Sequence, residues 1–230
     1  MPEPNTDLSQ GNQTLLRLWP WLAVLPFAVL AWAHWTDDPS IFSSDYAQYL
    51  LHAKAIAEGR PYGDVGYIST EHNPLIGPGV QPPGWPLILA PFVALFGTGL
   101  LAPKILVTLA TCAFLCATAL RFSRDDSRTV ALLAVAICGV ALESDFAINT
   151  PLSDLPFAAF LWGLILFVDS DTPLSWRRAV IVWFAGLLVM SVRVLGVALV
   201  PGFFLLAILR RRDRAQLLAI ACAWSALGMV

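Results

Sequence analysis

The chain has 230 residues, of which 57% are hydrophobic and 13% charged, with a net charge of −2 and a mean hydropathy of +0.69. A soluble domain usually carries about 25% charged residues. This composition therefore argues against a soluble globular protein and predicts an all-α, polytopic transmembrane helix bundle. The sequence has no basic face and no nucleic-acid motif, so nucleic acid is not expected as a partner.

Seven apolar segments are expected to cross the membrane, because a spanning helix needs ~20 mostly apolar residues. They are residues 15–35, 100–120, 129–147, 155–168, 179–191, 195–209 and 215–230. The shorter ones need tilt or help from neighbouring helices. The first segment lacks a basic n-region and an Ala-x-Ala cleavage site, so it is interpreted as a retained anchor rather than a secretory signal. Residues 1–14 are then a cytoplasmic tail, and residues 15–230 form one transmembrane domain.

The positive charges predict the orientation of these spans, since cytoplasmic loops carry the excess of Lys and Arg. Ten of the fourteen such residues fall in four places: Arg17; Arg121, Arg124 and Arg128; Arg177 and Arg178; and Arg210, Arg211, Arg212 and Arg214. If all four places are cytoplasmic, the loop 36–83, the turn 143–154 and Arg193 lie outside. Residues 85–96 are apolar but too short to cross, and an extra span there would move Arg121 outside. An interfacial or re-entrant helix is therefore expected at 85–96.

Other residues within or near the spans are given structural interpretations. The four cysteines fall inside predicted spans and are expected to be packing residues rather than ligands. Lys104 has two interpretations, contact with a lipid phosphate or snorkelling toward the membrane surface, and the second is the one expected. Five tryptophans near span ends are interpreted as interfacial anchors: Trp19, Trp21, Trp32, Trp35 and Trp85.

The first outer loop, residues 36–83, is more organised than a simple connector. Its apolar residues recur at helical spacing until Gly59, which predicts an amphipathic helix lying on the membrane surface. Asp45 occupies the first turn of that helix. Residues 63–84 are rich in Gly and Pro and predict an ordered loop. The apolar positions of the helix are Tyr46, Tyr49, Leu50, Ala53, Ile56 and Ala57.

Four sequence pieces, in this order, resemble the amino-terminal half of the GT-C membrane glycosyltransferases. They are SDYAQYLLHAKAIAEGRPY, QPPGWPLILAPFVALFG, PLSDLPFAAFLW and SVRVLGVALVP. More narrowly, they are similar to bacterial relatives of the dolichyl-phosphate-mannose protein mannosyltransferases and of the aminoarabinose transferases of lipid A. The resemblance covers most of residues 44–201. Members of this superfamily run to roughly twice this length, so a fragment, a truncated gene product, one half of a split pair and a genuine seven-span protein all remain open.

The resemblance implies that a sugar leaves a polyprenyl phosphate and passes, with inversion, to a lipid, glycan or protein acceptor. This would take place at the outer face of a bacterial inner membrane. Such a reaction needs a carboxylate that takes the proton of the acceptor, and Asp45 matches the catalytic Asp of the family. The alternative is that Asp45 only favours the positive end of its helix.

The second outer turn and the region after it contribute two further candidates. Asp154 is a second candidate catalytic residue, because it lies where similar enzymes place another acidic residue near the site. The alternative is helix capping, for which Asp is a common choice. Arg193 is expected where the outer ends of two spans meet, and contact with the donor phosphate is its proposed role. The alternative for Arg193 is a hydrated side chain at the membrane surface.

A divalent metal is left open as a cofactor. Glu71 and His72 are weak candidate ligands, since two adjacent loop residues do not define a site. The chain also departs from its resembled relatives. Tyr46 replaces the acidic residue that usually follows the catalytic Asp, and Gln81 and Pro82 replace an acidic and basic pair of the aminoarabinose transferases. Aminoarabinose as the donor sugar is therefore unsupported.

Two other classes of function compete with a transferase. One is a non-catalytic or degenerate membrane partner that keeps the fold without the donor site. The other is a small transporter or flippase, which ranks lowest because the acidic residues cluster toward the outer ends of the spans rather than at mid-membrane.

Overall fold

The computed structural model describes residues 19–29, 33, 44–66, 81–125, 128–142, 152–169 and 172–227. Every regular element among these residues is helical, which confirms the all-α prediction. A helix at Trp19–Val29 comes first. The labelled helices are α2 (Ser44–Ala57), α3 (Gly84–Phe96), α4 (Leu101–Asp125), α5 (Arg128–Leu142), α7 (Asp154–Val168), α8 (Trp176–Val192), α9 (Leu199–Leu209) and α10 (Arg214–Leu227), with short 3₁₀ helices at Val194–Ala198 (η3) and Arg211–Asp213 (η4).

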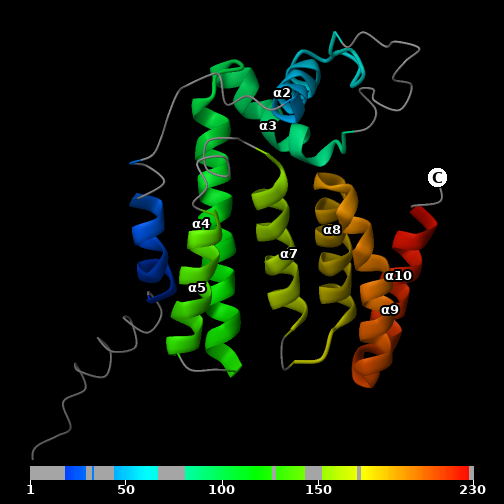
Figure 1. The fold of residues 1–230 in the computed structure, drawn as a ribbon. Helices are drawn as coiled ribbons and strands as arrows, with labels where there is room; N and C mark the ends of the chain where they lie inside the picture. The colour runs from blue at the N-terminus through cyan, green and yellow to red at the C-terminus, as the bar shows by residue number, and fades with distance from the viewer. Residues whose placement is uncertain are drawn as a thin grey trace, which may run out of the picture.

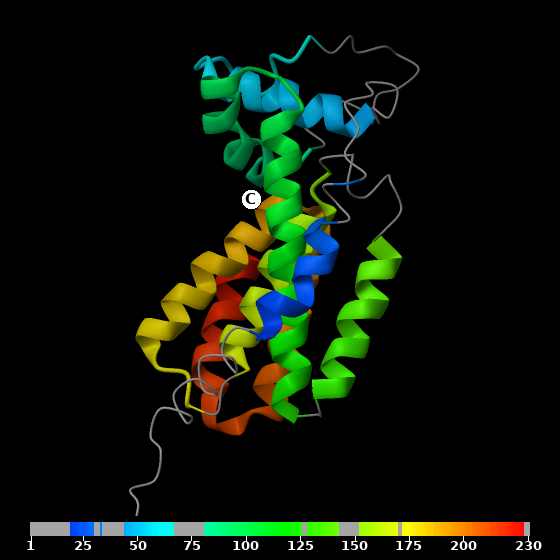
Figure 2. The same cartoon turned by 90° about the vertical axis from the view of Figure 1, so that its left-hand side faces the viewer.

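The long helices stand side by side and alternate in direction along the chain (Figure 1). Helices α4, α7 and α9 run away from the end covered by α2 and α3, whereas α5, α8 and α10 run back toward it. Figure 2 shows α2 lying across that end, at a steep angle to α4. The bundle therefore has one end closed by α2 and α3, and an opposite end where α4, α7 and α9 finish and α5, α8 and α10 begin.

Helix α2 forms where its apolar spacing predicts it and ends at Ala57, two residues before Gly59. The apolar face of α2 packs against α3 rather than lying open to a membrane. Tyr46, Tyr49 and Leu50 are buried in one cluster with residues of α3, α4, α7 and α8. The α3 members of this cluster are Trp85, Leu89, Ala90 and Val93. The α2–α3 pair is thus joined to the bundle by a continuous hydrophobic core.

A close approach between α3 and α8 determines how this pair sits on the bundle. A Cβ atom built at Gly84 would overlap both the side chain and the backbone of Ser191, near the end of α8. Only glycine allows the first turn of α3 to lie this near to α8. The segment that follows Pro82 and Pro83 is therefore held against the end of α8, directly beside the candidate site.

One described helix is long and apolar enough to cross a membrane by itself: Leu101–Ser123, with a mean hydropathy of 2.0. The pair Val194–Leu209 and Arg211–Leu227 meets the same criterion together, but the two are bent by 113° at their break. The core helix of a soluble protein can meet this criterion too. The other predicted spans correspond to shorter helices, among them Trp19–Val29 and Asp154–Val168. The helix expected at 85–96 is α3.

Besides the surface position expected for α2, two structural predictions are wrong. Lys104 does not snorkel, because it is buried in the first turn of α4. Trp85 is not an interfacial anchor, because it is buried in the core that α3 shares with α2, α4, α7 and α8. Both side chains are therefore part of the protein interior rather than of its surface.

Candidate functional site

The bundle end covered by α2 brings together the three main predicted site residues. Asp45 lies in the first turn of α2, Asp154 begins α7, and Arg193 follows the last residue of α8. The charges of all three act on the phenol of Tyr49 in α2. Residues separated by nearly 150 positions in sequence therefore lie around one side chain.

Arg193 and Asp154 form an ion pair between the Nη1 atom of the guanidinium and the Oδ1 atom of the carboxylate. Helices α7 and α8 pack against each other in opposite directions, so the start of one lies beside the end of the other. An acidic group is favoured at a helix amino terminus and a basic group at a carboxyl terminus. The two side chains thus complement their own helices and each other.

The backbone of Arg193 is extended, with φ −145° and ψ 142°, between α8 and the 3₁₀ helix η3. The carbonyl oxygen of Arg193 accepts a hydrogen bond from the Gly196 N–H at 2.8 Å. Its side chain is 29% exposed, while that of Asp154 is 58% exposed. The guanidinium is therefore held at the bundle end, where both water and a ligand can reach the pair.

Tyr49 connects α2 to the start of α7. Its hydroxyl lies 3.0 Å from the Ser153 Oγ atom, and both side chains are buried. Burial is the main effect on the pKa of Tyr49 and raises it, and the negative charges of Asp45 and Asp154 act in the same direction. The hydrogen bond with Ser153 and the positive charge of Arg193 lower this pKa and only partly offset the effect of burial. Tyr49 is therefore a neutral hydrogen-bonding group at neutral pH.

Gln81 holds the Asp45 end of the site. Its Nε2 atom lies 3.5 Å from Asp45 Oδ1 and 3.3 Å from Gln48 Oε1. The carbonyl oxygen of Gln81 accepts a 2.8 Å hydrogen bond from the Tyr62 hydroxyl. The side chain of Asp45 is exposed. Among the described residues, its one hydrogen-bond partner is Gln81, at the long distance given above. A carboxylate held in this way can accept a proton from a group that arrives from solvent.

His52 is a buried residue that sequence analysis did not single out. Its Nδ1–H donates to the Tyr62 carbonyl oxygen at 2.8 Å, and its ring stacks on the Tyr62 ring with centroids 4.1 Å apart. Its Nε2 atom is buried and has no hydrogen-bond partner among the described residues. Burial lowers the pKa of His52, and the hydrogen bond to Tyr62 opposes this effect. The neutral ring is therefore the folded form.

The weak metal-ligand candidates, Glu71 and His72, lie outside the described residues. Within the part of the chain that the structure describes, no group of three His, Cys, Asp or Glu side chains could hold a metal ion. The described site consists of two carboxylates, one guanidinium and a set of neutral hydroxyl and amide groups. It can hold an anion at Arg193 and take up a proton at Asp45.

Comparison with protein-family models, with curated proteins and with solved structures gives no match to this chain.

Proposed function

We propose that this chain is a multi-pass membrane glycosyltransferase, or the amino-terminal part of one, with its site on the outer face of a bacterial inner membrane. The alternating helix directions support several crossings. The basic connections support the orientation, since Arg121, Arg178 and Arg210 all lie at the end opposite to Asp45 and Arg193. Helices of 15 to 17 residues, such as α7 and α8, would cross with local thinning of the bilayer.

The observation that carries the proposed activity is the gathering of Asp45, Asp154 and Arg193 around Tyr49. The resemblance to GT-C transferases implies Asp45 and Asp154 for the reaction, whereas Arg193 is a candidate because it is a basic residue at the outer ends of two predicted spans. In the proposed reaction, the acceptor hydroxyl or amine attacks the sugar carbon that bears the polyprenyl phosphate. Asp45 takes the acceptor proton, and the polyprenyl phosphate leaves.

Arg193 is proposed to bind the phosphate of the donor, because a guanidinium presents paired N–H donors to phosphate oxygens. Stabilising the leaving phosphate in this way lowers the barrier. The ion pair with Asp154 supports a positioning role for that carboxylate, in addition to the catalytic role that the resemblance implies. A divalent metal, for which Glu71 and His72 are weak candidate ligands, would assist the departure of a phosphate.

The proposed partners are a polyprenyl-phosphate sugar as donor, membrane lipids as surroundings and a lipid, glycan or protein as acceptor. The position of the charges favours this activity over transport. Asp154 begins α7 and Arg193 follows α8, so both lie at helix ends rather than near the middle of the bundle.

The test is transfer of a labelled sugar from polyprenyl phosphate in membranes that contain this chain, alone and together with a downstream half if one is encoded beside it. Asp45→Asn is expected to reduce transfer by about 10²-fold or more, the range of a general base. Asp64→Asn is the matched control, since Asp64 is an acidic residue of the same loop that pairs with Arg60 at the surface. Equal transfer by Asp45→Asn and the wild type would overturn the assignment of the base. An absence of transfer in every combination would favour the non-catalytic membrane partner.

A further inference from the structure

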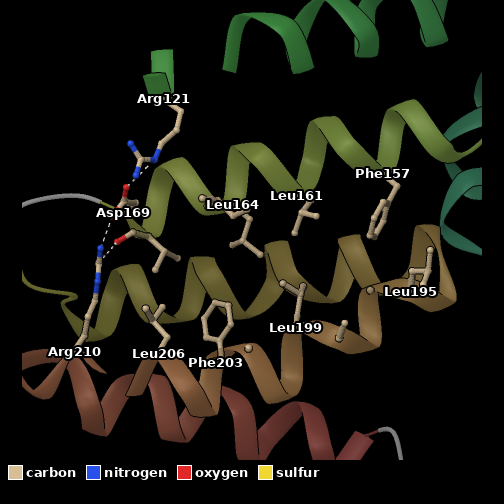
Figure 3. A pocket seen from close by; sticks show the side chains of 15 residues that line it. Arg121, Phe157, Leu161, Leu164, Asp169, Leu195, Leu199, Phe203, Leu206 and Arg210 are labelled. Atoms are coloured by element: carbon tan, nitrogen blue, oxygen red, sulfur yellow. Dashed lines mark hydrogen bonds and ion pairs between the residues drawn. The ribbon is translucent and has the colours of Figure 1, made fainter. Parts of the chain in front are cut away.

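A cavity of about 510 Å³ lies between α7 and α9 (Figure 3). Its walls are apolar along most of its length, with Leu161 and Leu164 of α7 facing Leu199 and Phe203 of α9. This volume falls within the roughly 300–1,000 Å³ that is usual for small-molecule sites. We call this cavity the α7–α9 groove.

The polar part of the groove is confined to the end farthest from Asp45. There the carboxylate of Asp169 forms ion pairs with two guanidinium groups. The Nε atom of Arg121 lies 3.2 Å from its Oδ2 atom, and the Nη2 atom of Arg210 contacts its Oδ1 atom. The three side chains are 32%, 30% and 25% exposed, respectively, so the cluster lies at the surface. Two guanidinium groups and one carboxylate leave one positive charge in excess.

Hydrogen bonds to backbone carbonyl groups hold this cluster in place, and Arg178 adds a further positive charge beside it. Arg210 also donates to the Val168 carbonyl oxygen at 2.9 Å. Arg178 donates to the Phe167 carbonyl oxygen at 2.7 Å, and its guanidinium carbon lies 5.0 Å from the centre of the Phe167 ring. Three basic side chains therefore surround the last turn of α7, where the helix dipole favours positive charge.

The shape and charge of the groove correspond to a lipid with an anionic headgroup. From Phe157 to Asp169 the groove follows about 18 Å of α7, at 1.5 Å for each residue. One leaflet contributes about 15 Å of hydrocarbon, half of the ~30 Å core of a bilayer. A single acyl chain can therefore lie along the groove while its headgroup reaches Arg121 and Arg210.

We infer that the α7–α9 groove binds an anionic phospholipid of the cytoplasmic leaflet, with an acyl chain in the groove and the phosphate at Arg121 and Arg210. This inference rests on the proposed membrane insertion but not on the transferase activity. Basic pockets between spanning helices on the cytoplasmic side are suited to anionic headgroups. The opposite end of the groove, near Phe157 and Leu195, offers only apolar contacts to the end of the chain.

The experiment is native mass spectrometry of the purified full chain, titrated with phosphatidylglycerol or with phosphatidylcholine of identical acyl chains. We expect tighter binding of phosphatidylglycerol. Arg210→Gln should weaken that binding about fivefold, which corresponds to ~1 kcal/mol for each basic side chain, whereas Arg210→Lys should retain most of it. Equal binding of the two lipids would overturn the inference.

A second pair of variants tests the groove without altering its charge. Gly202 lines the groove, and a Cβ atom added there meets nothing within 4 Å, so Gly202→Leu fills the space reserved for the acyl chain. Gly163 of α7 has equally open surroundings and is not among the lining residues, which makes Gly163→Leu the matched control. We expect Gly202→Leu to lose phosphatidylglycerol binding and Gly163→Leu to retain it. Unchanged binding in Gly202→Leu would refute the groove as the site.

Polyprenyl phosphate is the third arm of the titration. If the groove instead holds the donor lipid from its other end, binding will favour polyprenyl phosphate over phosphatidylglycerol. Binding of polyprenyl phosphate will then weaken in Arg193→Gln and remain unchanged in Arg210→Gln. That pattern would also overturn the inference, while leaving the proposed transferase intact.

Discussion

Tyr49 lies between the two halves of the candidate site, because it belongs to α2 yet contacts the start of α7. Its hydrogen bond with Ser153 joins residues 104 positions apart. Since both hydroxyl groups are buried, removing either one leaves the other without this partner. The pair therefore fixes the distance between the helix that carries Asp45 and the helix that begins at Asp154.

A double-mutant cycle measures this connection. Tyr49→Phe and Ser153→Ala should each lower the free energy of unfolding by about 1 kcal/mol, and the double variant should lose less than the sum. Chemical unfolding in detergent provides the values. Strictly additive losses would mean that the two hydroxyl groups do not act as a pair.

His52 predicts a pH dependence of stability. Burial lowers its pKa in the folded protein below the ordinary value near 6.5, so the unfolded chain binds a proton first as the pH falls. Stability should therefore decrease from pH 7 toward pH 5. Tyr62, which stacks on His52, does not titrate in this range, because burial and the nearby Tyr49 phenol raise its pKa to about 12.

The measurement is the thermal unfolding midpoint of the wild type and of His52→Phe at pH 7 and pH 5. The variant keeps an aromatic ring against Tyr62 but has no group that titrates. We expect a smaller fall of the midpoint in His52→Phe than in the wild type. The same fall in both proteins would assign the pH dependence to other groups.

Residue chemistry explains which parts of the site could be predicted from the sequence. Asp45, Asp154 and Arg193 stand out because charged residues are rare between apolar segments. Tyr49, Ser153 and Gln81 do not, because their role comes from contacts between distant segments that no local pattern reports. The burial of His52 was not predicted, because a single histidine in a helix does not indicate whether its side chain faces the core or the solvent.

At the scale of elements, the short helices α8 and α10 are held together by close packing between Gly186 and Trp224. A Cβ atom added at Gly186 would overlap the indole of Trp224, which is fully buried. The same indole donates through Nε1 to the Trp183 carbonyl oxygen at 3.1 Å. Trp224 therefore joins the two helices by both packing and a hydrogen bond.

Gly186→Ala should lower the free energy of unfolding by about 1–3 kcal/mol, because the indole must shift in a filled core. Gly163→Ala is the matched control, since its added methyl group meets open space. It should be neutral or stabilising by up to ~1 kcal/mol through helix propensity. Thermal unfolding of the two variants compares them directly, and equal stability would show that α8 and α10 are not tightly packed at Trp224.

The positions of the helices followed from the apolar spacing and from breakers such as Gly59, since both act locally. The partner of each helix face could not be predicted in the same way. The apolar stripe of α2 was expected to face a membrane, but Tyr46 and Leu50 pack in the core shared with α3. An amphipathic pattern identifies a face that must be covered without identifying what covers it.

At the scale of the whole molecule, the bundle separates its charges by end. Asp45, Asp154 and Arg193 lie at the end covered by α2 and α3, whereas Arg121, Asp169 and Arg210 lie at the other. The proposed transferase requires the first end to face outward, and the proposed phospholipid site requires the second to face the cytoplasm. Both proposals therefore depend on one orientation across the membrane.

That orientation is the central claim, and cysteine accessibility in intact cells tests it most directly. The four native cysteines are replaced by alanine, and single cysteines are placed at the exposed positions Asp64 and Thr172, at opposite ends of the bundle. We predict that a membrane-impermeant maleimide labels Asp64→Cys in intact cells, and Thr172→Cys only after the membrane is opened. Labelling of both positions in intact cells, or of Thr172→Cys alone, would contradict the account.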